Sequence, residues 1–388
     1  PNEQDAVASN QSFGVKAADA LKTPAFWIII AGVMLTALGM GWNNSQSGIA
    51  KELLAGTPDE ANAAVVGATM VSAAALGNLL QPYTEVAHLI CGGLSVFLVS
   101  MIVAKIVLFP SMIREDFKNS ILASVSATFF MTLMQLAGYL APAAIVPAFG
   151  LWCAAVAGHF ALMAWFTAHY IRNFKLHEVF PTYFICYVGI IVASVTSPAF
   201  GMQAFGQGVF WFGFACFMVL LAVMVARYIK HEVPEPARPL FCIFAAPMSL
   251  SVVGYLAVMP EPNMVFVGVL MALGQLKLLM VLTQLPKFVA LKFYPSYAAM
   301  TFPFAISAMA LGKGVQALFA AGYAIPALPV VEALIALETV FAAVMVTYVF
   351  VHYMKFFFGT PKGAPAAAPA VELPVVEAPV VRTVETAE

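Results

Sequence analysis

The sequence predicts an all-α integral membrane protein with ten transmembrane helices. Hydrophobic residues make up 62% of the 388 residues and charged residues only 10%, against about 45–50% and about 25% in soluble domains. Ten apolar stretches are long enough to cross a bilayer, which takes about 20 residues. Lys and Arg alternate between the connections as an even number of crossings requires. We therefore expect the lipid bilayer of the cell membrane to surround the fold.

The ten expected spans are apolar runs whose ends are marked by prolines. Proline has no N–H to donate and suits the start of a helix better than its interior. The expected spans are Ala25–Trp42, Thr84–Phe109, Ile121–Ala141, Val146–Tyr170, Pro181–Met202, Val209–Ile229, Leu240–Met259, Met264–Leu285, Tyr297–Leu318 and Leu328–Tyr353.

The basic residues predict the orientation of these spans. Fifteen of the 18 Lys and Arg residues lie in the two tails and in the even-numbered loops, whereas Lys51 and Lys313 lie on the opposite side and Lys277 lies within a span. Cytoplasmic loops are enriched in Lys and Arg. Both termini are therefore expected in the cytoplasm.

The chain divides into a membrane domain and two tails. We expect a cytoplasmic tail over residues 1–24, the ten-helix domain over 25–356, and a disordered tail rich in Pro, Ala, Val and Glu over 357–388. The outer loop 44–83 is long and contains the apolar segment Ala61–Leu80. As an eleventh span this segment would break the charge alternation, so we expect an interfacial helix that lies on or dips into the outer face.

Composition and motifs exclude several classes of function. A net charge of −1 gives no field that would attract nucleic acid. We find no hydrolase, zinc or phosphate-loop motif, and the five cysteines match no metal or disulfide spacing. A haem-bearing redox enzyme would need paired histidines at one depth, but His88 and His352 lie near opposite faces. We therefore expect no enzyme, no metal and no cofactor.

Two charged residues lie within spans, where charge is costly and often functional. Lys277 in the eighth span and Glu338 in the tenth lie at broadly similar depth. The interpretation we favour is a structural ion pair. Lys277 could instead extend to the membrane surface, or either residue could belong to a transport site.

Prolines within spans occur only in odd-numbered spans: Pro198 in the fifth, Pro247 in the seventh and Pro303 in the ninth. The first span has glycines instead, including Gly32. Broken helices are tolerated where they are buried in protein or line a water-filled cavity, although Pro and Gly are also common in membrane helices generally. The pattern favours a pore built by the odd-numbered spans, with polar backbone but no charged ring, which suits several kinds of anion.

Three passages then resemble a known family. They are FPTYFICYVGIIVASVTSPAFG at Phe180–Gly201, PARPLFCIFAAPMSLSVVGY at Pro236–Tyr255 and YAAMTFPFA at Tyr297–Ala305. A weaker match is Asp116–Phe130, where Asn119 and Ser120 replace the His-Pro that the family often has. Together these passages resemble the tellurite-resistance/dicarboxylate (TehA-like) transporter family, which is related to the plant slow-type anion channels.

The resemblance implies a homotrimer in which five odd-numbered inner helices of each subunit ring a pore and five even-numbered helices surround them. It places an aromatic pore gate at Phe302. The candidate pore-lining residues on the odd-numbered spans are Thr301, Pro303, Pro247, Ser251, Gly254, Gly189, Pro198 and Gly32. The implied partners are small inorganic or organic anions.

Two transport functions remain open from the sequence. The first is passage of small anions through a channel gated by an aromatic side chain. The alternative is a proton-coupled carrier of dicarboxylates, sulfite or tellurite. Coupling would require Lys277 or Glu338 to face the pathway, and both lie on even-numbered, outer spans.

Overall fold

The computed structural model describes residues 62–108 and 110–358, in which helices follow one another and no strand occurs. The two tails (1–24 and 359–388), the expected span Ala25–Trp42 and its Gly32 lie outside the described residues.

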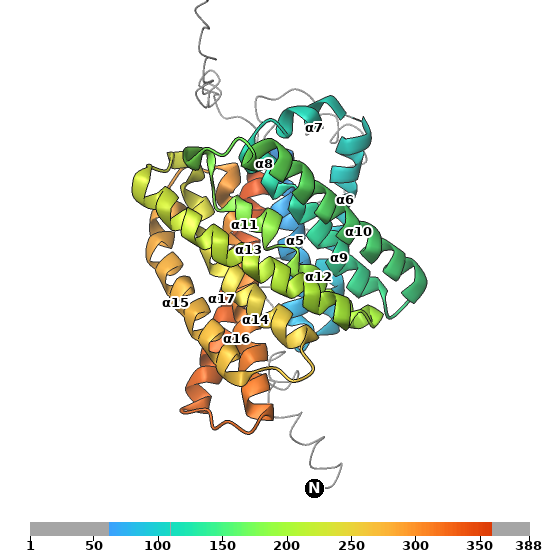
Figure 1. Cartoon of the computed structure of the whole chain (residues 1–388), viewed down its shortest axis with the longest axis vertical. Coiled ribbons are helices and arrows are strands. Elements are labelled where there is room, and N and C mark those ends of the chain that lie inside the picture. The colour runs from blue at the N-terminus through green and yellow to red at the C-terminus, as the bar shows by residue number, and fades with distance from the viewer. Residues whose placement is uncertain (1–61, 109, 359–388) are drawn as a thin grey trace, which may run out of the picture.

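In the first half of the described chain, long helical segments cross the bundle one after another (Figure 1). Short connections join them, so successive segments run in opposite directions. The elements are α5 (Asn62–Leu80), α6 (Glu85–Leu108), α7 (Pro110–Asp116), α8 (Ser120–Val125), α9 (Ala127–Leu140), α10 (Ile145–Phe166), the π-helical turn η1 (Thr167–Ile171), the 3₁₀ turn η2 (Leu176–Glu178), α11 (Thr182–Tyr187), α12 (Ile191–Thr196) and the 3₁₀ turn η3 (Ser197–Phe200).

The second half continues the same alternation of direction. Its elements are α13 (Gln203–Lys230), the 3₁₀ helix η4 (Glu235–Ala245), α14 (Ala246–Val258), α15 (Met264–Val289), the 3₁₀ helix η5 (Pro295–Met300), α16 (Phe302–Ala320) and α17 (Leu328–Phe358).

Local sequence explains where several of these helices begin. The Asn119 side chain accepts the backbone N–H of Ile121 at 2.9 Å and so caps α8. Asn263 caps α15 by accepting the N–H of Phe266 at 3.0 Å. An Asn at this position satisfies a donor that has no partner within its own helix. Asn119 therefore fixes the start of α8.

Nine helical segments in the described residues are long and apolar enough to cross a membrane, and they correspond to the nine spans expected between residues 84 and 353. Their ends differ from the expected ones by a few residues; the largest shift is at the start of the sixth, which begins at Gln203 instead of Val209. The sequence-based prediction of an all-α membrane protein is confirmed.

Burial alternates along the chain and separates two sets of helices. In the third, fifth, seventh and ninth spans, 56–83% of the central residues are buried within the protein; in the second, fourth, sixth, eighth and tenth only 28–44% are buried. The first set comprises α8–α9, α11–α12–η3, η4–α14 and η5–α16. We call these four, together with α5, the inner helices.

Helix α5 lies inside the bundle, which overturns the expectation of an interfacial helix over Ala61–Leu80. Every residue from Thr69 to Gly77 is buried. The helix contacts α6, α9, α16 and α17, and Figure 1 shows it running among the other helices. Its small side chains permit this close packing on several sides. Helix α5 is thus the first inner helix among the described residues, and the span expected at Ala25–Trp42 lies outside them.

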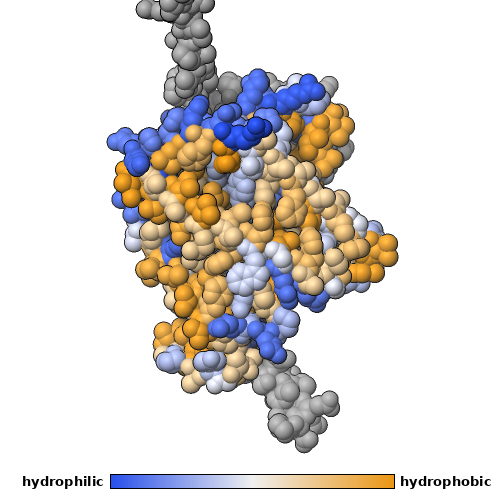
Figure 2. Space-filling view, viewed as in Figure 1, coloured by the Kyte–Doolittle hydropathy of each residue, from blue (hydrophilic) through white to orange (hydrophobic). Residues whose placement is uncertain are grey.

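The outer surface shows the two-zone pattern of a membrane protein. In Figure 2, apolar residues cover the middle of the visible face, and hydrophilic residues gather at the end that carries α7. Exposed large apolar side chains lie on outer helices, such as Val219 and Ile229 on α13 and Leu276 and Leu279 on α15. This surface is suited to contact with lipid chains.

A buried ion pair fixes α7 to the end of α6. Lys105 Nζ lies 2.6 Å from Asp116 Oδ2, and both side chains are almost fully buried. Lys118 and Glu115 form a second pair at 2.6 Å, but both of these side chains are exposed. The two ion pairs have the same N–O distance and differ in the burial of their side chains.

We predict that Lys105→Met lowers the free energy of unfolding by about 3–5 kcal/mol, because it removes the cation that lies 2.6 Å from a buried carboxylate. Lys118→Met is the matched control and should cost less than about 1 kcal/mol, since exposed pairs contribute little. Denaturant titration of the purified protein in mixed micelles measures both. Equal losses in the two variants would show that the buried pair contributes no more than the exposed one.

Candidate functional site

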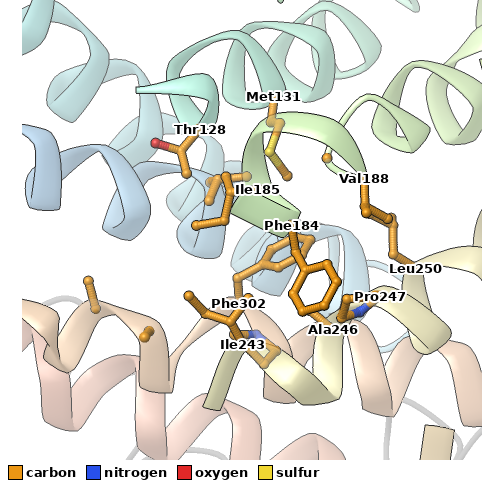
Figure 3. Close-up of a pocket in the computed structure, with 15 residues that line it drawn as sticks. Thr128, Met131, Phe184, Ile185, Val188, Ile243, Ala246, Pro247, Leu250 and Phe302 are labelled. Carbon is orange, nitrogen blue, oxygen red and sulfur yellow. The ribbon is translucent and has the colours of Figure 1, made fainter. Parts of the chain in front are cut away.

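The inner helices enclose an apolar cavity of about 50 Å³ (Figure 3). One water needs roughly 10–15 Å³ of such space, so the cavity holds only a few waters or one small ion. All five inner helices contribute to its wall, and no outer helix does. The wall residues are Val71, Thr128, Met131, Phe184, Ile185, Val188, Gly189, Ile243, Ala246, Pro247, Leu250, Ala298, Ala299, Phe302 and Pro303.

Four inner helices are interrupted at the level of this cavity. Helix α8 gives way to α9 at Ser126, and α11 gives way to α12 across residues 188–190. The 3₁₀ helix η4 changes to α14 at Ala246, and η5 changes to α16 at Thr301. Wall residues lie at or within a few positions of each of these breaks. The breaks therefore define the depth of the cavity.

Proline and glycine account for three of the breaks. Gly189 allows the two N–H groups of residues 188 and 189 to share the carbonyl of Phe184. A methyl group in place of its hydrogen would lie 2.2 Å from the Ile185 carbonyl oxygen, so glycine is required there. Pro247 and Pro303 have no N–H to donate and occupy the first turns of α14 and α16.

Hydroxyl groups supply partners to backbone carbonyls around the breaks. Ser126 Oγ donates to the Leu122 carbonyl at 2.9 Å and Thr128 Oγ1 donates to that of Val125 at 2.7 Å. Ser249 and Ser251 donate to carbonyls four residues earlier. Bonds of this type bend helices. They also use up the hydroxyl protons, so Thr128, the one wall residue with a side-chain hydroxyl, presents no free donor.

The wall therefore offers an ion almost no replacement for its water. Its side chains are aliphatic or aromatic except for Thr128, and none of them carries a charge. Hydrophobic constrictions of this kind close a pathway by excluding water. The arrangement is a narrow, dry barrier in the middle of the inner helices, with Phe302, Phe184 and Ile185 drawn at its wall in Figure 3.

The structure separates the candidate pore-lining residues into two groups. Gly189, Pro247, Phe302 and Pro303 lie in the cavity wall. Thr301 is fully buried behind it, and the remaining described candidates lie elsewhere on the inner helices. These are Ser251, which is buried on α14, Gly254, and Pro198, which is half-buried in η3.

Gly254, a candidate pore-lining residue, lies at a close contact between two inner helices. A methyl group at Gly254 would lie 2.4 Å from Cγ2 of Ile191. The missing side chain lets α14 approach α12 closely, so Gly254 is a contact between helices.

The expected ion pair between Lys277 and Glu338 is not formed. Lys277 Nζ lies 4.8 Å from the centre of the Phe217 ring on α13 and has no hydrogen-bond partner in the described structure. Glu338 Oε2 accepts a long hydrogen bond of 3.4 Å from Gln275 Nε2. The two charges therefore contact different neighbours, and neither lies in the cavity wall.

A histidine of an outer helix supports one of the breaks. His159 on α10 is fully buried, and its Nε2 lies 2.8 Å from the carbonyl oxygen of Cys186. A carbonyl only accepts, so Nε2 carries the proton. Cys186 directly precedes the break at 188–190, where the backbone ladder changes register. His159 thus donates a hydrogen bond to the broken inner helix.

Several of these features escaped the sequence analysis. Helix α5 contributes Val71 to the wall, and Phe184, Ile185 and Leu250 are further wall residues that the sequence analysis did not name. The signal for α5 was its run of small residues, which is typical of helices in close contact with others. Among the described residues, no cluster of three or more His, Cys, Asp or Glu side chains could hold a metal.

We predict that His159→Leu lowers the free energy of unfolding by about 1–3 kcal/mol, because the buried Cys186 carbonyl loses its donor. His159→Gln can donate again and should recover part of the loss. His169→Leu is the control: His169 is exposed and contacts only its own helix region through Trp165, so a change within about 0.5 kcal/mol is expected. An effect of His159→Leu no larger than this would contradict the support assigned to His159.

The comparison with protein families agrees with this architecture. A search of curated protein sequences finds no match. A family model described as voltage-dependent anion channel matches residues 61–354. The matched region begins next to α5 and ends within α17, so among the described residues it covers α5, the nine spanning segments up to residue 354 and the whole cavity wall. The chain belongs to the voltage-dependent anion channel family.

Proposed function

We propose that the protein is a channel for small anions and that the ring of Phe302 is its gate. Membership of an anion channel family gives the class of substrate. The observation that carries the finer proposal is the position of Phe302, which is half-buried, lies in the cavity wall and is the first residue after a break in the ninth helix.

Closure follows from the size and chemistry of the cavity. A phenyl ring at a constriction of about 50 Å³ leaves room for little water. An anion cannot pass without its hydration shell or a substitute for it. Movement of the ring out of the cavity, together with a small shift at the break, would readmit water. On this proposal, the conformation in the structure corresponds to the closed state.

A channel fits the cavity better than a proton-coupled carrier of dicarboxylates, sulfite or tellurite. Coupling requires a group in the pathway that gains and loses a proton. None of the side chains in the cavity wall does so at ordinary pH. Lys277 and Glu338 lie on the outer helices α15 and α17 and contact Phe217 and Gln275. No observation in the described structure favours the carrier.

The proposal extends to orientation and assembly. Eleven of the 13 Lys and Arg residues between 62 and 358 lie at the end of the bundle that carries α7 or in its adjoining connections. By the positive-inside rule that end faces the cytoplasm of a cell membrane. The family resemblance supports a homotrimer with one pore in each subunit, which native mass spectrometry of the detergent-solubilised protein would test.

We predict that Phe302→Ala increases anion current in planar bilayers by at least about tenfold, because it removes the side chain that closes the cavity. The matched control is Phe304→Ala. Phe304 is buried and packs on Phe341 of α17 at 5.0 Å between ring centres, and it is not in the cavity wall. Its truncation should cost about 3–5 kcal/mol of stability but leave the current unchanged. A folded Phe302→Ala protein that stays silent would remove the gate.

A second prediction separates the channel from the carrier. With Phe302→Ala in the bilayer, an anion gradient should set the reversal potential, and a pH gradient of two units should leave it unchanged. The wall has no titratable side chain, so proton flux is not tied to anion flux. A reversal potential that follows the pH gradient would favour the carrier.

A further inference from the structure

The joint that precedes Phe302 has little backbone support. Thr301 connects η5 to α16 with φ −123° and ψ −79°, which is neither 3₁₀ nor α-helical. Pro303 has no N–H, so one bond of the helical ladder is missing there. Two N–H groups, of Phe304 and Ala305, reach the Thr301 carbonyl at 3.2 and 3.4 Å, which is at the long end for such bonds.

Side-chain hydrogen bonds connect this joint to its surroundings. Thr301 Oγ1 donates to the Ala298 carbonyl at 2.5 Å, and it lies 2.6 Å from Ser72 Oγ. The Ala298 carbonyl can only accept, so it takes the Thr301 proton. Ser72 on α5 is therefore the donor to Thr301. Both hydroxyl groups are fully buried, and Ala298 is itself a wall residue.

Hydrogen bonds from neighbouring helices hold α5 in place on the Ser72 side of this bond. Three side chains from neighbouring helices donate to its backbone carbonyls: Ser95 to Met70 at 3.0 Å, Tyr139 to Ala74 at 2.8 Å and Gln135 to Val71 at 3.4 Å. These carbonyls flank Ser72 on both sides along the helix. Movement of the joint relative to α5 would have to break the Ser72–Thr301 bond.

We propose that the hydrogen bond from Ser72 to Thr301 is the latch that holds the Phe302 gate closed. This inference rests on the proposed function. Ser72 and Thr301 are positioning residues: neither is in the cavity wall, and they act by fixing the joint from which Phe302 extends. Opening separates the two buried hydroxyl groups and breaks their hydrogen bond, so the bond favours the closed state.

Single-channel recording in planar bilayers tests the latch. Ser72→Ala should raise the open probability roughly three- to tenfold, the effect of losing one buried hydrogen bond, and leave the unitary conductance unchanged. Thr301→Val removes the same bond from the other side and should act alike, whereas Thr301→Ser keeps the hydroxyl and should behave as wild type. The double variant Ser72→Ala/Thr301→Val should open no more than the stronger single variant.

Two further variants provide the controls. Ser194→Ala removes a fully buried hydroxyl that donates to the Gly206 carbonyl at 2.8 Å, and this bond involves neither α5 nor the joint, so its open probability should equal that of wild type. In the Phe302→Ala background, Ser72→Ala should add nothing, since no gate remains to be held.

The outcomes distinguish the latch from the gate. If Phe302→Ala gives no current, the proposed function fails. If Phe302→Ala conducts but Ser72→Ala and Thr301→Val open like wild type, the latch is wrong and the gate survives. The latch is also overturned if Ser194→Ala opens as much as Ser72→Ala, or if Ser72→Ala raises the open probability further in the Phe302→Ala background.

Discussion

The structure depends on the need to satisfy backbone polar groups where no water is available. In a bilayer each unpaired N–H or C=O is costly, so an interrupted helix persists only if other groups supply the missing partners. Four inner helices are interrupted here, and each interruption has such partners. Serine and threonine hydroxyls bond carbonyls near the breaks, and His159 donates to Cys186 from an outer helix. The outer helices thus contribute hydrogen bonds as well as a lipid-facing surface.

The same requirement places the breaks at one depth. A cavity between helices forms where several helices depart from regular helical geometry at the same level. The wall residues lie at these departures. Packing of the outer helices against the inner ones then holds the departures in place. The cavity is therefore a product of the bundle as a whole, although its wall comes from five helices.

Nine spans could be predicted from the sequence because lipid-exposed helices must be apolar over about 20 residues. Helix α5 could not be recognised in the same way, because its surroundings are protein. Its Ala, Gly, Ser and Thr residues serve close contact with other helices, and such composition gives a weak hydropathy signal. Assignment of 25–42 as the first span also made the charge pattern argue against α5. Of the residues that the sequence analysis placed on the odd-numbered spans, Gly189, Pro247 and Pro303 lie in the cavity wall, where a helix cannot continue regularly.

The depth of a residue within its span could be predicted better than the side chain that it contacts. Lys277 and Glu338 have similar depth, but Gln275, two residues before Lys277, contacts Glu338 instead. Two residues correspond to about 200° around a helix, so Lys277 points away, toward Phe217. The pairs Ser72–Thr301 and His159–Cys186 join residues 229 and 27 positions apart. Such pairs depend on how helices rotate against one another, which periodicity in a single sequence does not determine.

The parallel direction of the inner helices has an electrostatic consequence. Helices α9, α14 and α16 begin at the cavity, and α8, η4 and η5 end there in the same direction. Positive and negative ends of helix dipoles therefore lie next to each other at this level and largely cancel. No side chain of the wall carries a charge, so an anion in an opened cavity would depend on readmitted water for its stabilisation.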